Sequence, residues 1–178
     1  SLSLINSALK SNSKCKFLSV FGGPHPTFAA DEMIKRDGVD ALCVGEGDLV
    51  FPEFCSRLEQ GEDFWETSNF VVNYQGRVFK NPIGPLVENL DDLLFPDREM
   101  MYQADPGLRE NGRKMFFGSR GCPYLCTYCF NAEYNAMTKG QGDVMRHRSP
   151  ENVIEEVLQV KERYPINTVW VDDDTFLI

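Results

Sequence analysis

The chain has 178 residues, of which 42% are hydrophobic and 25% are charged, and its formal net charge is −9 at pH 7. This length suits one ordinary domain, or a small domain plus part of another, and the acidic balance argues against nucleic acid as the main partner because phosphate binding requires clustered Lys and Arg. No apolar run is long enough to span a bilayer and no signal peptide is visible, so we expect a cytoplasmic protein with no membrane span.

The first segments of the chain predict helix, strand and helix in turn. Ser1 opens a stretch that is typical of a helix. The apolar run Phe17–Phe21 predicts a strand that stops at Gly22 and Gly23, and Asp31–Arg36 then predicts a short helix.

A second strand and a second helix follow. Ala41–Val44 predicts an apolar strand that stops at Gly45, Glu46 and Gly47, and residues 49–61 predict an amphipathic helix that ends at Gly61. Strands that alternate with helices are typical of a parallel sheet. The glycine turns would then lie at the carboxyl edge of this sheet, where open α/β folds bind their ligands.

The middle of the chain has a different pattern. Phe70–Phe79 predicts a hairpin that turns at Gln75 and Gly76, and a proline-rich connection follows it. We interpret residues 66–112 as an interdomain linker that contains this hairpin. It would join an α/β domain at residues 1–65 to a second domain at residues 113–178.

The second domain predicts a strand, a cysteine loop, a helix and another strand. Lys114–Gly118 and Thr168–Val171 are the strands, and Ser149 is a suitable N-cap for the helix between them. The apolar positions of this helix predict a buried stripe of Val153, Val157 and Val160, with Ile154 and Leu158 beside it. Such a unit cannot close on itself, so we expect a fragment that is truncated at both ends.

Three of the six cysteines, Cys122, Cys126 and Cys129, lie within eight residues. The other three are scattered in or beside apolar runs, where a buried free thiol is the usual state. A structural zinc site needs four ligands, and here only His147 is available as a distant fourth. Three thiolates without a fourth suit an iron–sulfur cluster with one open iron better, although zinc remains an alternative.

The C-x3-C-x2-C spacing, with Tyr128 before the last cysteine, resembles the radical S-adenosylmethionine (SAM) superfamily. The segments "RHRSPENVIEEV" and "VWVDDDTF" fit the same resemblance. It implies a partial (β/α) TIM-like barrel, of which only the first strands are present. It also implies that the three cysteines are the metal ligands of a 4Fe-4S cluster, with SAM bound at the open iron.

The same resemblance implies further SAM contacts. Tyr128 would lie near the adenine, and the aspartates after the last strand would contact the SAM amino group, with Asp173 and Asp174 as the candidates beside Asp172. The alternative is that these aspartates only cap the following turn. The arginines before the helix, Arg146 and Arg148, could contact a carboxylate, but we expect them to pair with the acidic surface.

"FGGPHPTF" and "DALCVGEGD" resemble the second half of a flavodoxin/Rossmann-like cobalamin-binding domain of the kind that precedes many radical SAM domains. The resemblance implies that the glycine turns hold the nucleotide tail of cobalamin, because glycine lets the backbone approach a bulky cofactor. The candidate cobalamin-binding residues are Gly22, Gly23, Pro24, His25, Gly45, Glu46 and Gly47.

A lone histidine such as His25 suggests a ligand of the cobalt, but the surrounding sequence "GGPHPT" is not the motif that cobalt-binding histidines occupy. In domains that use such a histidine, it lies in an Asp-x-His-x-x-Gly motif after the first strand, a part that would precede Ser1. We therefore expect a partly buried imidazole bonded to backbone.

The function implied is that of a cobalamin-dependent radical SAM enzyme, most commonly a methyltransferase that acts on an unactivated carbon of a small-molecule or natural-product substrate. A low-potential flavodoxin or ferredoxin would donate electrons, and the fragment alone would lack turnover. No residue can be assigned as catalytic. The alternatives are a radical SAM enzyme of the cyclase or rearrangement type without bound cobalamin, and a zinc-stabilised, non-catalytic binding module.

Overall fold

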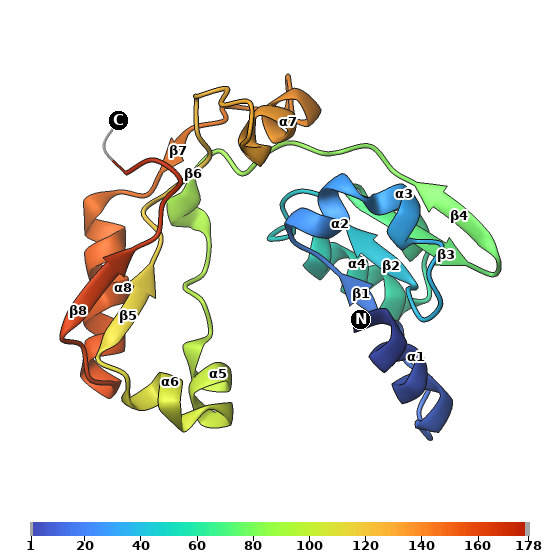
Figure 1. Ribbon diagram of the computed structural model, residues 1–178, viewed down its shortest axis with the longest axis horizontal. Helices are drawn as coiled ribbons and strands as arrows, with labels where there is room; N and C mark the ends of the chain where they lie inside the picture. The colour runs from blue at the N-terminus through green and yellow to red at the C-terminus, as the bar shows by residue number, and fades with distance from the viewer. Residues whose placement is uncertain (1, 177–178) are drawn as a thin grey trace. The chain divides into compact units, whose positions relative to one another are not determined.

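The computed structural model describes residues 2–176 and has an α/β fold that divides into two compact units, Ser1–Leu86 and Val87–Ile178 (Figure 1). Each unit is built on its own β-strands and is described separately below. Within residues 2–176, no helix combines the length and the apolar character needed to cross a lipid bilayer.

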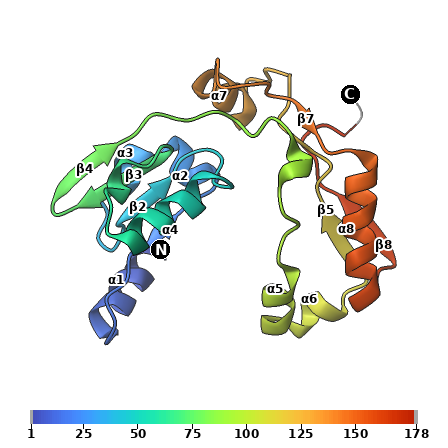
Figure 2. The ribbon, with the colours of Figure 1, turned by 180° about the vertical axis from the view of Figure 1, so that it is seen from behind.

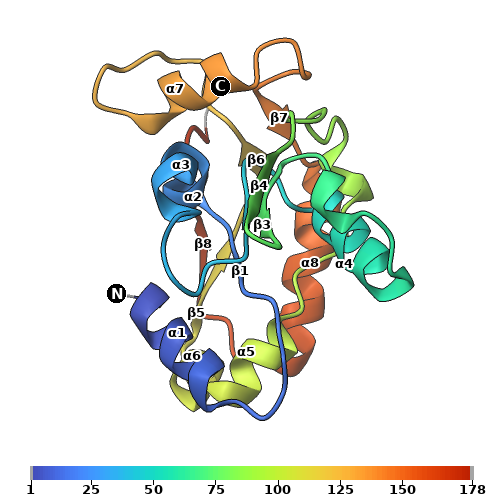
Figure 3. The same cartoon turned by 90° about the vertical axis from the view of Figure 1, so that its right-hand side faces the viewer.

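The first unit is centred on a four-stranded sheet with the order β1-β2-β3-β4. β1 (Val20–Phe21) and β2 (Ala41–Cys43) are parallel, and β3 (Phe70–Tyr74) and β4 (Arg77–Lys80) extend the sheet as antiparallel strands. The helical elements of this unit are α1 (Leu2–Asn12), α2 (Pro24–Phe28), α3 (Ala30–Met33), α4 (Val50–Gln60) and the 3-10 turn η1 (Phe64–Glu66). Figure 3 shows α2 and α3 on one side of the sheet and α4 on the other.

The segment after β1 differs from the prediction. The strand expected at Phe17–Phe21 is reduced to its last two residues, and "PHPTF", expected as loop, forms α2. Pro24 occupies the first turn of α2, where its fixed φ suits a helix and its missing N–H costs nothing. The helix expected at Asp31–Arg36 begins one residue earlier and is shorter.

The hairpin is confirmed, but it belongs to the first sheet. Gln75 and Gly76 have φ of 52° and 79°, as the two central residues of a tight hairpin turn require. Ala41 of β2 pairs with Val72 of β3, so the hairpin extends the sheet and does not stand alone in a linker. The division between the units falls between Leu86 and Val87, inside the range that was expected to be linker.

Aromatic side chains pack α4 onto the sheet. Phe54 stacks on Phe70 with ring centroids 4.3 Å apart, and the edge of Phe64 meets Phe54 at 5.4 Å. All three rings are buried, and burial of each such side chain stabilises the fold by roughly 1.5–3 kcal/mol. Gly61 ends α4 in the left-handed conformation, which confirms the predicted stop of this helix.

The second unit has two strand pairs. β5 (Arg113–Phe116) and β8 (Thr168–Val171) are parallel, so their carboxyl ends lie at one edge, and β6 (Ser119–Arg120) and β7 (Arg146–His147) are antiparallel. The helical elements are η2 (Leu90–Asp92), α5 (Arg98–Ala104), α6 (Pro106–Glu110), α7 (Phe130–Met137) and α8 (Pro150–Arg163). Figure 2 shows α8 lying against the pair β5–β8. The strand at Thr168–Val171 matches the prediction, whereas α7 was not predicted.

α8 begins as predicted but buries a different face. The Ser149 hydroxyl oxygen accepts a hydrogen bond from the Asn152 amide at 3.2 Å, which confirms the N-cap. Val160 is buried, but Ile154 and Leu158 are exposed, and Glu156 occupies a buried position instead. The expected apolar stripe is therefore only partly correct.

Two arginines explain why Glu156 is buried. Its carboxylate pairs with Arg98 at 2.8 Å and with Arg148 at 2.6 Å. The expectation that Arg148 pairs with the acidic surface is wrong, because its partner is this buried carboxylate. Arg146 is also buried, and its Nη1 donates to the carbonyl oxygen of Val87 at 2.8 Å.

Candidate functional site

The cysteine loop begins where β5 ends. The Gly118 amide donates to Asp173 Oδ1 at 2.8 Å, and the Arg148 amide donates to the Gly118 carbonyl oxygen at 2.8 Å. Because β5 and β8 are parallel, the residues that follow both strands meet at one edge. The structure therefore brings the aspartates after β8 to the start of the cysteine loop.

Gly121 fixes the path of the chain just before the first cysteine. Its φ is +84°, and a Cβ added there would lie 2.1 Å from the Val144 carbonyl oxygen. Beside it, Ser119 and Arg120 pair with the β7 strand, so the start of the loop is held against the segment that leads to α8. Only glycine combines this backbone conformation with so close an approach.

Replacing Gly121 with alanine is expected to lower the free energy of unfolding by about 2 kcal/mol or more, because left-handed strain and a clash with backbone add together. Gly140 provides a matched control, since its φ is +83° but nothing lies within 4 Å of an added Cβ. Gly140→Ala should therefore show the conformational cost alone. Urea denaturation measures both variants, and equal losses would contradict the close contact at Gly121.

The three cysteines of the loop differ in burial. Cys122 is buried, its Sγ accepts a hydrogen bond from Thr175 Oγ1 at 3.1 Å, and its carbonyl oxygen accepts one from Asn135 Nδ2 at 2.9 Å. Cys126 is exposed and Cys129 is half-buried, and the Cys129 amide donates to the Cys126 carbonyl oxygen at 3.0 Å. The loop is thus anchored at Cys122, while its other two thiols are accessible.

Among residues 2–176, no three His, Cys, Asp or Glu side chains are close enough together to hold a metal ion. The three thiols of the loop are therefore not gathered on one point, and neither is a four-ligand set with His147. The donor set nevertheless fits an iron–sulfur cluster, because all three are free thiols and two of them are accessible on a short loop. No sulfur has to be released from a disulfide to make these ligands available.

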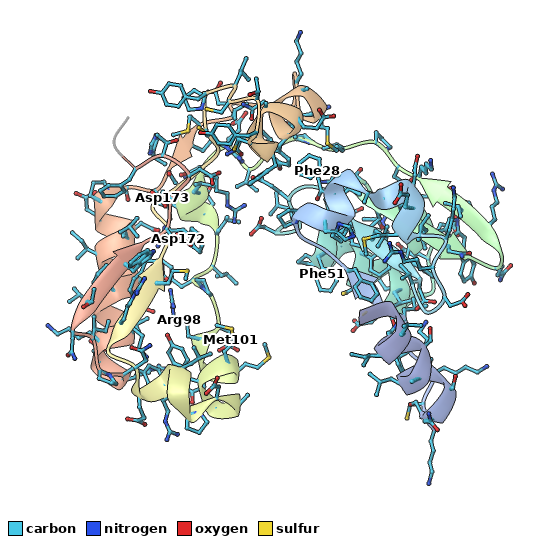
Figure 4. All side chains as sticks on the ribbon, in the orientation of Figure 1. Phe28, Phe51, Arg98, Met101, Asp172 and Asp173 are labelled. Carbon is cyan, nitrogen blue, oxygen red and sulfur yellow. The ribbon has the colours of Figure 1, made fainter. Side chains whose placement is uncertain are left out.

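The residues predicted to contact SAM differ in exposure and in hydrogen bonding. Asp173 Oδ1 accepts from the Gly118 amide after β5, which is not the cap of its own following turn that was the alternative. Asp172 and Asp174 are exposed, and Figure 4 shows Asp172 and Asp173 beyond the end of β8. Tyr128 is 92% exposed, so its ring is free to meet a ligand.

Thr27 joins the two glycine turns of the first unit. Its buried hydroxyl group donates to the Gly23 carbonyl oxygen at 2.8 Å and accepts from the Gly45 amide at 3.1 Å. Gly23 and Gly45 have φ of +95° and +81°, which favours glycine at both positions. The structure thus brings the two predicted turns together, and sequence reasoning missed the residue that connects them.

Asn69 fixes the second turn from the other side. With φ of 63°, it directs its Nδ2 to the Glu46 carbonyl oxygen at 3.1 Å, and its Oδ1 accepts from the Gly84 amide at 2.6 Å. Its own carbonyl oxygen accepts from the Val44 amide at 2.7 Å. No local pattern in the sequence marks this asparagine, because its partners lie about 15 to 25 residues away.

Cys43 lies beneath both turns. An added Cβ would lie 3.8 Å from Cys43 Cβ at Gly22 and 3.3 Å from Cys43 Sγ at Gly47. Burial, with a smaller contribution from Asp48, raises the pKa of the Cys43 thiol to about 11, so it stays protonated at neutral pH. It fills space below the turns as a neutral side chain.

The remaining candidates of this unit are at its surface. His25 and Pro24 are exposed, so the expectation of a partly buried imidazole is wrong. Glu46 is half-buried, in the second turn. Figure 4 labels two partly exposed aromatic side chains, Phe28 and Phe51, which follow the two turns along the chain.

Comparisons of the sequence relate the chain to methyltransferases, although no protein-family model matches it. It is 30% identical over 164 residues to an uncharacterized methyltransferase of Pyrococcus horikoshii. This alignment covers 89% of the present chain and 34% of the Pyrococcus protein. It is 31% identical over 121 residues to TokK, a cobalamin-dependent radical SAM methyltransferase of Streptomyces tokunonensis, over 63% of this chain and 17% of TokK. The chain thus spans about a third or less of these relatives.

Solved structures share the fold. The radical enzyme OxsB with aqua-cobalamin and S-adenosylmethionine bound aligns with a TM-score of 0.70 and 20% identity, over 98% of this chain and 23% of OxsB. The methyltransferase TsrM from Kitasatospora setae, with cobalamin and a [4Fe-4S] cluster bound, aligns with a TM-score of 0.67 and 14% identity, over 97% of this chain and 33% of TsrM. The α/β fold of the chain therefore aligns with a part of such enzymes.

Proposed function

From the homology of this chain, over most of its length, to cobalamin-dependent radical SAM methyltransferases, we propose that it is the cofactor-binding part of such an enzyme. Cys122, Cys126 and Cys129 would hold a 4Fe-4S cluster, and the glycine turns of the first unit would hold cobalamin. When bound, these groups supply the electron that cleaves SAM to a 5′-deoxyadenosyl radical and the methyl group that is transferred.

The observation that supports the proposal most is the placement of three free thiols directly after β5, beside the residues that follow β8. Ligands of α/β folds bind at the carboxyl edge of the strands, and this loop lies at that edge. Three thiolates leave one iron of a cubane cluster without a protein ligand, which is the position where SAM would bind.

The chain's own residues would position SAM. Asp174 is exposed and suited to accept hydrogen bonds from the SAM amino group. Asp173 would combine such a contact with its bond to the Gly118 amide, and Tyr128 would lie beside the adenine. The exposure of the Tyr128 ring allows this stacking.

In the first unit, Gly22, Gly23, Gly45 and Gly47 would let the backbone approach the nucleotide tail of cobalamin. Pro24, His25 and Glu46 would lie beside the same nucleotide tail. The bonds that Thr27 and Asn69 make to the turns hold this backbone in place before the cofactor arrives, which lowers the ordering cost of binding.

Replacing Thr27 with valine is expected to weaken cobalamin binding about tenfold, because the Gly45 amide would lose its acceptor and the two turns their connection. The dissociation constant is measured by titration of the anaerobic protein with cobalamin, followed by absorbance. Thr168→Val, at an exposed position of β8, is the control and should leave the affinity unchanged. An unchanged affinity in Thr27→Val would contradict this role.

The substrate and the partners follow from the same proposal. We expect a small-molecule or natural-product substrate, methylated at an unactivated carbon, and a low-potential flavodoxin or ferredoxin as the electron donor. A cytoplasmic setting with little oxygen suits a cluster that has one exposed iron.

The test is to purify the protein without oxygen, with iron, sulfide and cobalamin supplied, and to measure the content of each. We expect about four iron and four sulfide per chain together with a corrinoid spectrum. About one zinc with no iron or sulfide would overturn the cluster and favour a zinc-stabilised module. Iron and sulfide without corrinoid would overturn the cobalamin part alone.

A further inference from the structure

We infer that Thr175 tunes the reduction potential of the cluster through its hydrogen bond to the sulfur of Cys122. Thr175 Oγ1 donates to Cys122 Sγ at 3.1 Å, although the two residues are 53 positions apart in the chain. This inference rests on the proposed function, because it assigns Cys122 as a cluster ligand. Thr175 is a positioning residue in this scheme and does not touch SAM or the substrate.

The surroundings of Cys122 make this contact persistent. The sulfur is buried, and the Cys122 carbonyl oxygen is held by Asn135 of α7 at 2.9 Å, so the residue is fixed from two sides. The segment after β8 that carries Thr175 is fixed as well, because Asp173 accepts from the Gly118 amide at 2.8 Å. The hydroxyl group and the sulfur are therefore presented to each other by two anchored segments.

The other two thiols of the loop lie in different environments. Cys126 is exposed and Cys129 is half-buried, so water is available to both of them. Cys122 is the buried ligand, where a single protein hydrogen bond has more weight because the local dielectric constant is low. Donors to cluster sulfurs are a general means of setting reduction potentials.

The direction of the effect follows from charge. Reduction adds an electron to the cluster and its thiolates, so the reduced form is the more negative one. A hydroxyl group that donates to a thiolate stabilises the more negative form and raises the reduction potential. Removing the hydroxyl group should therefore make the cluster harder to reduce.

The experiment compares Thr175→Val with Thr175→Ser and the unchanged protein after anaerobic reconstitution with iron and sulfide. The solution reduction potential is held constant with dithionite and mediators. At this potential we expect Thr175→Val to show about a three- to tenfold lower ratio of reduced to oxidised cluster, which corresponds to the loss of one hydrogen bond. The ratio is read from the electron paramagnetic resonance signal of the reduced cluster. Thr175→Ser keeps the hydroxyl group and should restore the ratio, and Thr168→Val, at an exposed position of β8, is the control.

Three results would overturn the inference, and they are distinguishable. A Thr175→Val cluster with full iron content and an unchanged ratio leaves the proposed function standing and removes the role of Thr175. Loss of the cluster in Thr175→Val, with rescue in Thr175→Ser, shows a role in assembly and not in tuning. Failure of the unchanged protein to take up iron and sulfide removes both the proposed function and the inference.

Discussion

Replacing Cys126 with alanine is expected to abolish the iron–sulfur cluster while leaving the fold intact. Cys126 is exposed, so removing its thiol opens no cavity, and its backbone bond to Cys129 does not depend on the side chain. A cluster held by only two thiolates would lack the third protein ligand that the loop provides. We expect iron and sulfide to fall to background and the brown colour to be lost, measured by metal analysis and visible absorbance after reconstitution.

The matched control is Cys15→Ala. Cys15 is also an exposed free thiol, but it lies outside the loop, so its loss should change neither iron content nor stability. For both variants, the free energy of unfolding of the cluster-free protein should stay within about 0.5 kcal/mol of the unchanged protein. Full iron and sulfide in Cys126→Ala would show that this thiol is not a ligand.

Replacing Glu156 with alanine is expected to destabilise the second unit by about 3–5 kcal/mol, because two guanidinium groups would lose their carboxylate in a buried setting. The side chain of Glu156 is 3% exposed, and those of Arg98 and Arg148 are 14% and 12% exposed. The arginines keep other partners, since Arg98 donates to the Met115 carbonyl oxygen at 2.7 Å and Arg148 to the Phe117 carbonyl oxygen at 2.9 Å. These bonds do not neutralise the charges.

Urea denaturation followed by circular dichroism measures this loss. Glu155→Ala, at the exposed neighbouring position of α8, is the control and should change stability by no more than about 0.5 kcal/mol. Glu156→Gln keeps the shape and one acceptor but not the charge, so we expect an intermediate loss. If Glu156→Ala and Glu155→Ala were equally stable, the ion cluster would contribute nothing to this unit.

Elements that depend on neighbouring residues were predicted well. The hairpin turn at Gln75 and Gly76, the N-cap at Ser149 and the strand at Thr168–Val171 each follow from short-range backbone preferences and match the structure. The resemblance also implied that the aspartates lie near the cysteine loop, and the parallel pairing of β5 with β8 brings both to one edge. The turn, the N-cap and the strand need no knowledge of distant contacts.

Features that depend on distant partners were missed. The apolar period of α8 assigned charged positions to solvent, but Glu156 is buried because Arg98, 58 positions away, meets it. The hairpin was assigned to a linker because its pairing with β2 leaves no trace in its own sequence. Thr27 was overlooked for the same reason, since its partner Gly45 is 18 positions away. Within residues 2–176 the three thiols are not gathered on one point, so their convergence on a cluster stays a prediction.

The hydrogen bonds that Arg98 and Arg148 donate to backbone carbonyl oxygens occupy the edge of β5 that faces away from β8. The carbonyl oxygens of Gly112 and Phe116 face β8, whereas those of Met115 and Phe117, which accept from the two arginines, face the opposite edge. A strand could add at that edge only by displacing two charged side chains that are also held by a buried carboxylate. The two arginines therefore block the addition of a further strand at the β5 border of this sheet.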